Sequence, residues 1–202
     1  MVAVRDSHLT NPADFDAKTW TSSLALTKAE QEELFAFYNR LANISFAQAD
    51  ADVTESQTAD EVAETDANSV APLLAYGVEM IEILMTMDMD METLTAALLY
   101  PFFEAKLFDA EAIETEFGDK LVKLLVSVVE MDAIRTLQAK TSKPSESQVD
   151  NLRRMLMAIV DDVRAIVIKL AERICHLRDV KDASEEERVL AAKEISDIYA
   201  PL

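Results

Sequence analysis

The sequence predicts an all-α fold, a bundle of roughly eight helices. Only 2 Gly and 5 Pro occur in 202 residues, too few for the turns of a β-rich protein. Half of the residues are hydrophobic, and long stretches repeat apolar residues every three or four positions, which is the helical period. We expect one compact unit, made of an N-terminal helical and acidic segment, 1–68, and a main helical domain, 69–202.

The N-terminal segment predicts one helix. The first twenty-odd residues show no clear period and are expected to be irregular. Thr27 and Glu30 then have the spacing of a capping box, in which each side chain accepts the other residue's backbone N–H at a helix start. Leu34, Phe37 and Leu41 follow at helical spacing. The stretch 48–69 is acidic and nearly without large apolar residues, so we expect a solvated connector there.

The middle of the chain predicts three helices. The first covers 69–87, and the second covers 91–107 with Asp88 or Asp90 as its N-cap. The run MDMDME, 87–92, superficially resembles a calcium loop, but it lacks the glycine and the terminal glutamate of that motif. A helix N-terminus, where acids are favoured by the dipole, explains it better. A short third helix begins at Asp109.

The C-terminal third predicts four more helices. Residues 118–139 form a long one, and 140–147 form a loop. Two strongly periodic helices follow, 148–160 and 161–180, with a break near 160–162. The last helix opens on Ser184 and Glu187, a second capping box, and runs to residue 200. Its apolar end carries no C-cap, from which we infer a fragment of a longer protein.

Charge and composition exclude several classes of function. The formal net charge is -19, so this chain should repel the phosphate backbone of nucleic acids. It has no run of about 18 uncharged apolar residues that would span a membrane, and no apolar secretory segment at its start. Cys175 is the single cysteine and cannot form an internal disulfide, which suits the reducing cytoplasm.

Residue spacing alone yields no catalytic set. Glu172 and His176 share a helix face and could hold half of a metal site, although an ion pair is the simpler expectation. Cys175 and His176 are neighbours and point about 100° apart, so they do not readily bind one metal. The stretch AALLYPFFEAK, 96–106, places Tyr100 and Pro101 inside an otherwise good helix, where a proline costs about 3 kcal/mol.

Several segments resemble one family. Residues 150–180 and the runs METLTAALL, FGDKLVKLL and RVLAAKEISDIYAPL resemble the RelA/SpoT family of (p)ppGpp synthetase/hydrolases, in its HD-type hydrolase domain, over at least 69–202. The opening MVAVR and the pair before Asn151 resemble the RelA branch. The resemblance implies an all-α HD-domain-like bundle, followed in whole members by a synthetase domain and by C-terminal domains that contact the ribosome.

The resemblance also offers an explanation for the odd tyrosine and proline. Active family hydrolases bind a divalent metal, usually manganese, through four residues, and the two that follow AALL are His-Asp. Here those two positions are Tyr100 and Pro101. The upstream family histidine falls at Tyr76, and the family aspartate is Glu172 in KLAER. Because a phenol and a proline cannot replace an imidazole and a carboxylate as ligands, no metal cofactor is expected.

The resemblance implies no catalytic residue either, and Glu104 remains as the remnant of an acidic pair. Tyr76, Tyr100, Phe102 and Phe103 are expected to fill the former metal pocket by packing. Asn151 and Arg154 stand in DNLRRM, where the family has an asparagine that contacts the nucleotide, so they are possible guanine-nucleotide ligands, although surface residues without such a role are the simpler interpretation.

Three functions follow as expectations. The first is an inactive hydrolase-like domain of a GTP pyrophosphokinase, with a structural or regulatory role on the synthetase domain of the same chain. This fragment would then not be an enzyme, although the full-length protein would be. The second is weak residual metal-dependent (p)ppGpp hydrolysis, with Glu172 as a ligand. The third is a domain that senses guanine nucleotides without cleaving them.

Overall fold

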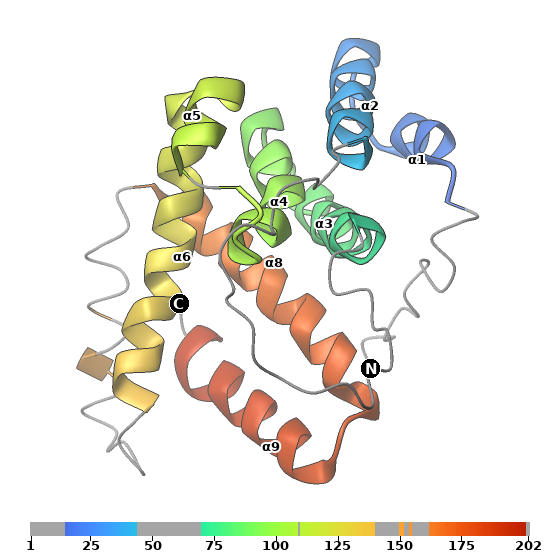
Figure 1. Ribbon diagram of the computed structural model, residues 1–202. Coiled ribbons are helices and arrows are strands. Elements are labelled where there is room, and N and C mark those ends of the chain that lie inside the picture. The colour runs from blue at the N-terminus through green and yellow to red at the C-terminus, as the bar shows by residue number, and fades with distance from the viewer. Residues whose placement is uncertain are drawn as a thin grey trace, which may run out of the picture.

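The computed structural model describes residues 15–43, 70–108, 110–139, 150, 151, 154 and 162–200. Regular structure in these ranges is helical throughout, which confirms the predicted all-α fold. They contain eight α-helices (Figure 1): α1 Ala17–Ser23, α2 Lys28–Ala42, α3 Val70–Met85, α4 Met91–Glu104, α5 Ala110–Phe117, α6 Asp119–Ala139, α8 Val163–Asp179 and α9 Glu185–Glu194. None of these helices is both long and apolar enough to cross a bilayer.

Both predicted capping boxes are present. The Thr27 N–H donates to the Glu30 carboxylate at 2.8 Å, and the Glu30 N–H donates back to the Thr27 hydroxyl at 3.4 Å. Ser184 and Glu187 repeat this exchange at 3.0 and 3.3 Å at the start of α9. Each box satisfies N–H groups that have no partner within the helix, and so fixes where α2 and α9 begin.

The expectation of an irregular N-terminus is wrong for α1. Asp16 caps this helix by accepting the backbone N–H groups of Lys18 and Thr19. The helix is held by the buried Trp20, whose ring centroid lies 5.7 Å from that of Phe15 and 6.3 Å from that of Tyr38 on α2. The Asp16 cap and the two ring contacts of Trp20 therefore stabilise α1, a helix that a search for apolar periodicity overlooks.

The helix α4 starts and ends at residues with distinct backbone conformations. Asp90 is its N-cap and accepts the Thr93 N–H at 2.9 Å, whereas Asp88 has a positive φ of 52° and lies outside the helix. Lys106 adopts a φ of 58°, so the helix ends at Glu104 rather than continuing to residue 107 as expected. A left-handed residue just past the last turn is a common helix stop.

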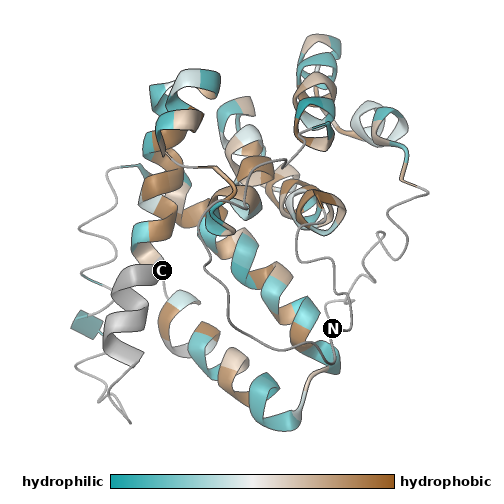
Figure 2. Cartoon of the chain, in the orientation of Figure 1, coloured by the Kyte–Doolittle hydropathy of each residue, from teal (hydrophilic) through white to brown (hydrophobic). Residues whose placement is uncertain are grey.

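Four helices, α3, α4, α6 and α8, form the centre of the described structure. The helix α4 packs on α3 and α8, α6 packs on α4 and α8, and α2 covers α3 and α4. Hydrophobic residues gather on α3, α4 and the described part of α6, and hydrophilic residues are more frequent on α2, α8 and α9 (Figure 2). The α3–α4 contact is close at Gly77, where an added Cβ would lie 2.9 Å from the Leu98 carbonyl oxygen.

Some predicted segments lie outside the described residues. They are His8, the acidic stretch 48–69, the loop 140–147 and most of the helix predicted for 148–160. The last predicted helix is α9, which continues as a short π-helical turn, η3 Ile195–Tyr199.

Candidate functional site

The helix α8 begins at the predicted break. Asp162 is extended, with φ -120° and ψ 112°, and its carboxylate accepts the Arg164 backbone N–H at 2.9 Å. An aspartate N-cap satisfies a free N–H group at the helix start and suits the positive end of the helix dipole. The same arginine then reaches across to α4.

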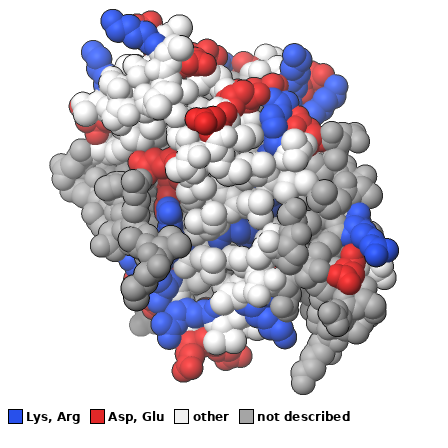
Figure 3. Space-filling model, turned by 180° about the vertical axis from the view of Figure 1, so that it is seen from behind, with Lys and Arg blue, Asp and Glu red and all other residues white. Residues whose placement is uncertain are grey.

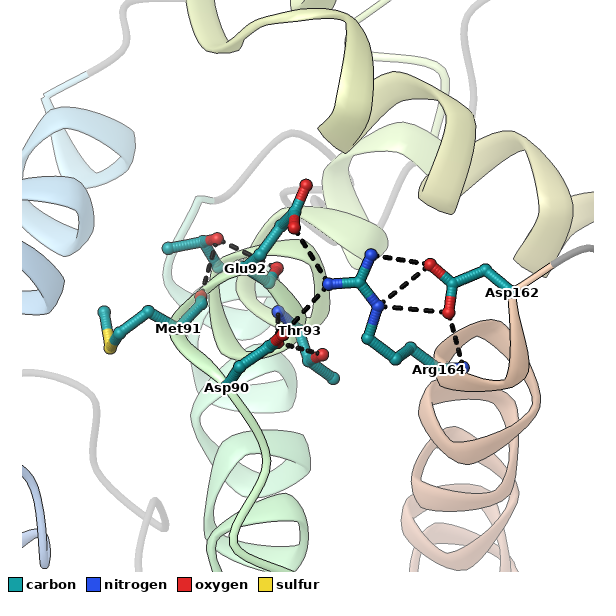
Figure 4. Close-up of polar contacts among 7 residues, drawn as sticks. Asp90, Met91, Glu92, Thr93, Asp162 and Arg164 are labelled. Carbon is teal, nitrogen blue, oxygen red and sulfur yellow. Dashed lines mark hydrogen bonds and ion pairs between the residues drawn. The ribbon is translucent and has the colours of Figure 1, made fainter.

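Arg164 joins the starts of α4 and α8 (Figure 4). Its guanidinium lies 3.0 Å from Asp90, 2.8 Å from Glu92 and 2.6 Å from Asp162. Hydrogen bonds to Asp162 and Glu92 raise the pKa of Arg164, and the hydrogen bond from Arg164 lowers the pKa of Asp162. We call the ion pairs of Arg164 with Asp90, Glu92 and Asp162 the Arg164 clip. Because Asp90 and Asp162 are the N-caps of α4 and α8, the Arg164 clip joins the first turns of the two helices.

A central polar cluster lies further along the same two helices, where α3 also reaches them. We define it as Tyr76 on α3, Tyr100 on α4, and Lys169, Glu172 and Arg173 on α8. The Lys169 ammonium donates to the Tyr100 hydroxyl at 3.1 Å and lies 2.9 Å from the Glu172 carboxylate. Lys169 and Tyr100 are fully buried, and Glu172 is 3% exposed. Charged groups in such a place need partners, because an unpaired buried charge is costly.

Both carboxylate oxygens of Glu172 accept hydrogen bonds. Oε2 receives the Lys169 ammonium and the Arg173 Nε–H, and Oε1 receives the Arg173 Nη2–H and the Tyr76 hydroxyl at 3.3 Å. Burial alone would raise the pKa of Glu172, but the hydrogen bond from Arg173 and the charge of Lys169 hold it below its usual range. The carboxylate is therefore ionised at neutral pH.

Tyr76 and Arg173 extend the cluster to neighbouring helices. The single Tyr76 hydroxyl proton is shared between the Glu172 carboxylate and the Glu172 backbone carbonyl, which lies at 3.1 Å. Burial together with the Glu172 charge raises the pKa of Tyr76, so it stays protonated as a donor. Arg173 also lies 3.3 Å from Glu194 on α9, and its guanidinium lies 5.9 Å from the centroid of the Tyr199 ring. The cluster thus connects α3, α4, α8 and the C-terminal helix.

The residues at the four predicted metal positions do not suit a divalent ion. Tyr76, Tyr100 and Glu172 do converge through the cluster, and Pro101 is buried beside Tyr100 in the last turn of α4. A carboxylate offers about four lone-pair positions, and four donors already lie on Glu172. Among the described residues no group of three or more His, Cys, Asp or Glu is placed to hold a metal. We therefore derive no chemistry through a metal.

The remaining predicted residues are exposed. Glu104 is exposed at the last residue of α4. Asn151 and Arg154 are helical and exposed. The expected ion pair of Glu172 with His176 is wrong, because the partners of Glu172 are Lys169, Arg173 and Tyr76.

The prediction of aromatic packing in the former pocket is only partly right. Tyr76 and Tyr100 do lie there, but their hydroxyl groups bind charged side chains. Phe102 packs its ring against Phe108, 6.3 Å between centroids, toward α5. The volume between the two tyrosines and Glu172 therefore holds the lysine ammonium.

Sequence reasoning from spacing missed Lys169 and Arg173. A signal was available, because Ala165, Ile168 and Glu172 define the buried face of α8, and Lys169 falls on it. A lysine on the apolar face of a helix is a candidate for a buried ion pair. Cys175 lies on the same face, and burial raises its thiol pKa, so the thiolate does not form at neutral pH.

The described residues on one side of the molecule show no continuous basic face. On the side shown in Figure 3, Lys and Arg side chains are interspersed with Asp and Glu and separated by uncharged residues. An interface for nucleic acid would need basic groups gathered together.

Comparison with known proteins places the chain in a family. Residues 52–202 match the HD domain model. The whole chain is 45% identical over 204 residues to a GTP pyrophosphokinase of Escherichia coli K12, and 44% identical over 203 residues to one of Haemophilus influenzae. It covers 25% of each, so it spans about a quarter of the length of these curated relatives.

A second kind of relative carries a hydrolase name. Over 135 residues, 67% of the chain, it is 34% identical to the bifunctional (p)ppGpp synthase/hydrolase SpoT of Escherichia coli K12, of which it covers 18%. The chain belongs to the HD-domain family, among the relatives of GTP pyrophosphokinases and (p)ppGpp hydrolases that its motifs predict.

Proposed function

We propose that this chain is a catalytically silent (p)ppGpp hydrolase-like domain of a larger GTP pyrophosphokinase. It would have a structural and regulatory role on a synthetase domain of the same protein, which would itself carry the transfer of pyrophosphate to GTP or GDP in the stringent response. Contact with the ribosome would belong to further domains of the whole protein, as the resemblance implies.

The observation that supports this most is the chemistry at the four predicted metal positions. Tyr76, Tyr100 and Pro101 supply no imidazole or carboxylate, and Glu172, the one carboxylate, is paired with Lys169 and Arg173. Without a bound metal, no water has its pKa lowered for attack on the 3′-pyrophosphate. A regulatory role needs contacts with the neighbouring domain that differ between an active and an inactive state.

Incubation of the purified chain with ppGpp and manganese tests whether the domain hydrolyses ppGpp. We expect no pyrophosphate release above the buffer background. The bifunctional relative SpoT is the positive control in the same buffer. Release by this chain that is abolished by Glu172→Gln would overturn the proposal and would support residual hydrolysis.

The test of regulation uses the full-length protein that contains this domain. Arg173→Met would weaken the connection from the cluster to α9, and we expect it to change the rate of ppGpp synthesis, while Arg40→Met on the far α2–α5 contact leaves it unaltered. Equal rates in both variants and the parent would argue against coupling through the cluster.

The exposed Asn151 and Arg154 favour a second candidate, nucleotide sensing without cleavage. A nucleotide that binds the folded chain must raise its melting temperature. Titration with ppGpp and GDP should then give a rise that Arg154→Met removes. No shift at millimolar nucleotide would discard this candidate.

A further inference from the structure

The end of α9 departs from a regular α-helix. In the turn η3, the Ala200 N–H donates to the Ile195 carbonyl at 2.8 Å, a hydrogen bond that spans five residues instead of four. A π-helical turn of this kind holds one residue more than an α-helical turn. It is rare, and it occurs mostly as a single turn inside an α-helix, frequently at a functional site. The contacts that the extra residue makes possible therefore need to be identified.

The extra residue changes which side chain faces the inside of the molecule. Ala191 is the buried residue of α9. Each residue of a regular α-helix turns the side-chain direction by about 100°, so Ile198 would point within about 20° of Ala191, and Tyr199 would point about 80° away. Because the π turn absorbs one residue, Tyr199 takes the direction that Ile198 would otherwise have. Tyr199 is accordingly 1% exposed, whereas Ile198 is only half-buried.

The buried ring of Tyr199 lies against Arg173 on α8. The Arg173 guanidinium is 5.9 Å from the centroid of this ring, within the distance of a cation–π contact. The same guanidinium pairs with Glu172 and lies 3.3 Å from Glu194, the residue directly before η3. Arg173 therefore contacts both ends of the π turn and connects it to the carboxylate at the predicted metal position.

Two helix registers can place an apolar side chain at this contact. With the π turn, Tyr199 packs against Arg173, and in a regular helix Ile198 would lie there instead. The regular helix is the far commoner form, whereas the π turn gains the contact between Tyr199 and Arg173. The two arrangements exclude each other, and shifts of a helix between discrete packed positions are a known means of switching in proteins.

We propose that η3 is a register switch between this domain and the synthetase domain, which the family resemblance places after it. This inference rests on the proposed function, because it needs a synthetase domain in the same protein. A change from the π turn to a regular helix would rotate the backbone beyond Tyr199 by about 100° around the helix axis. It would also separate Tyr199 from Arg173. The contacts of Arg173 would thus favour one orientation of the following domain over the other.

Deletion of one residue tests the register in this chain. Without the exposed Ser196, a regular α-helix would give Tyr199 the direction that the π turn gives it now. We expect this variant to melt within about 2 °C of the parent or above it. The matched control is deletion of Ala36, an exposed residue between the buried Leu34 and Leu41 of the regular helix α2. Because α2 has no extra residue to absorb the loss, the melting temperature should fall by roughly 10 °C or more. An equal fall in the two deletions would overturn the inference.

Two alanine substitutions measure the same register independently. Tyr199→Ala removes a buried aromatic ring and should lower the melting temperature by roughly 10 °C. Ile198→Ala removes a half-buried side chain and should cost less than half of that shift. A regular helix would bury Ile198 and turn Tyr199 away, so the reverse order of the two losses would contradict the π register.

The rate of ppGpp synthesis by the full-length protein tests the switch itself. Deletion of Ser196 favours the present direction of Tyr199 and of the chain beyond it. The exchange Ile198→Tyr with Tyr199→Ile favours a regular helix, because the tyrosine would then face Arg173 without a π turn. We expect the two variants to change the rate several-fold in opposite directions. Equal rates, or changes in the same direction, would overturn the switch. Pyrophosphate release by the parent chain would instead overturn the proposed function, so the two failures are distinguishable.

Discussion

Glu172 makes the free energy of unfolding depend on pH. Its pKa is lowered in the fold, despite the opposing effect of burial, by Arg173 and Lys169. A lowered folded-state pKa means that the carboxylate stabilises the fold above its unfolded pKa of about 4.3, and that this contribution is lost as the pH falls through the folded-state pKa. The group therefore contributes fully at neutral pH.

Glu172→Gln tests this linkage. We expect it to lower the free energy of unfolding at pH 7 by about 3–5 kcal/mol, because two buried cations lose their counter-charge. The difference from the parent should shrink as the pH falls below about 4.3. Urea unfolding at pH 7, 5, 4 and 3 measures it. Glu116→Gln, at a half-exposed pair with Arg40, is the control and should change little. A pH-independent difference would contradict the assignment.

Tyr100→Phe removes only the oxygen that accepts from Lys169. We expect a loss of about 1–3 kcal/mol, because a buried ammonium N–H is left without that partner. Tyr76→Phe is the matched comparison, since Tyr76 is half-buried and is one of four donors to its carboxylate. It should cost less, about 0.5–1.5 kcal/mol. Chemical unfolding of both variants decides the order, and a larger loss for Tyr76→Phe would count against the central role of Lys169.

At the scale of elements, a helix start is predictable where a capping box precedes a periodic apolar segment; the single Asp16 cap of α1 is not enough. Thr27 with Glu30 and Ser184 with Glu187 specify α2 and α9 from four residues each, and the structure contains both boxes. The end of α4 is not predictable in this way, because Lys106 carries no turn signal and its left-handed conformation follows from how the chain turns toward α5. Local sequence therefore specifies where α2 and α9 begin, whereas the end of α4 is set by a residue without a local signal.

The candidate site was only partly accessible from the sequence. Family resemblance placed Tyr76, Tyr100 and Glu172 at corresponding positions, and the fold brings them together. The identity of the group between them depends on which way Lys169 points. That direction depends on the register of α4 against α8, which no local pattern specifies. A long side chain on a buried face therefore remains ambiguous until the opposite helix is known.

Gly77→Ala tests how closely α3 and α4 must approach. The new Cβ would lie 2.9 Å from the Leu98 carbonyl oxygen and 3.0 Å from its Cα, and backbone atoms cannot rotate away. We expect a loss of about 1–3 kcal/mol from the forced separation, reduced by a gain of up to about 1 kcal/mol in helix propensity. The net change should be destabilising.

Gly118→Ala is the comparison for that measurement. A Cβ at Gly118 meets no atom within 4 Å, but its φ of +95° strains any other residue. It should therefore lose stability through the backbone conformation alone, without any change at the tyrosines. Quenching of the cluster's tyrosine fluorescence separates the two variants, since only Gly77→Ala should alter it. A stabilised Gly77→Ala would mean that α3 can move away freely.

At the scale of the whole molecule, the net charge of -19 destabilises the folded state, whereas the ion pairs between helices stabilise it. Like charges repel in the compact state, and that repulsion weakens as salt screens it. The ion pairs respond in two ways. The Arg164 clip is partly exposed, at 26% for Arg164 and 56% for Asp90, so salt weakens it too. The pair of Lys169 and Glu172 is buried and should hardly respond.

Melting temperatures measured at increasing sodium chloride concentration separate the repulsion between like charges from the contribution of the ion pairs. The parent should melt higher as salt rises from about 0.01 M to about 0.15 M, because the Debye length falls from about 30 to about 8 Å. Arg164→Met should lie about 1 kcal/mol below the parent at low salt, and the gap should narrow as screening removes what the clip contributes. The difference in stability between Tyr100→Phe and the parent should stay constant over the same range, because the hydrogen bond between Lys169 and Tyr100 is buried and salt does not screen it. Two results would contradict this account. One is a difference between Arg164→Met and the parent that does not change with salt, and the other is a difference between Tyr100→Phe and the parent that becomes smaller.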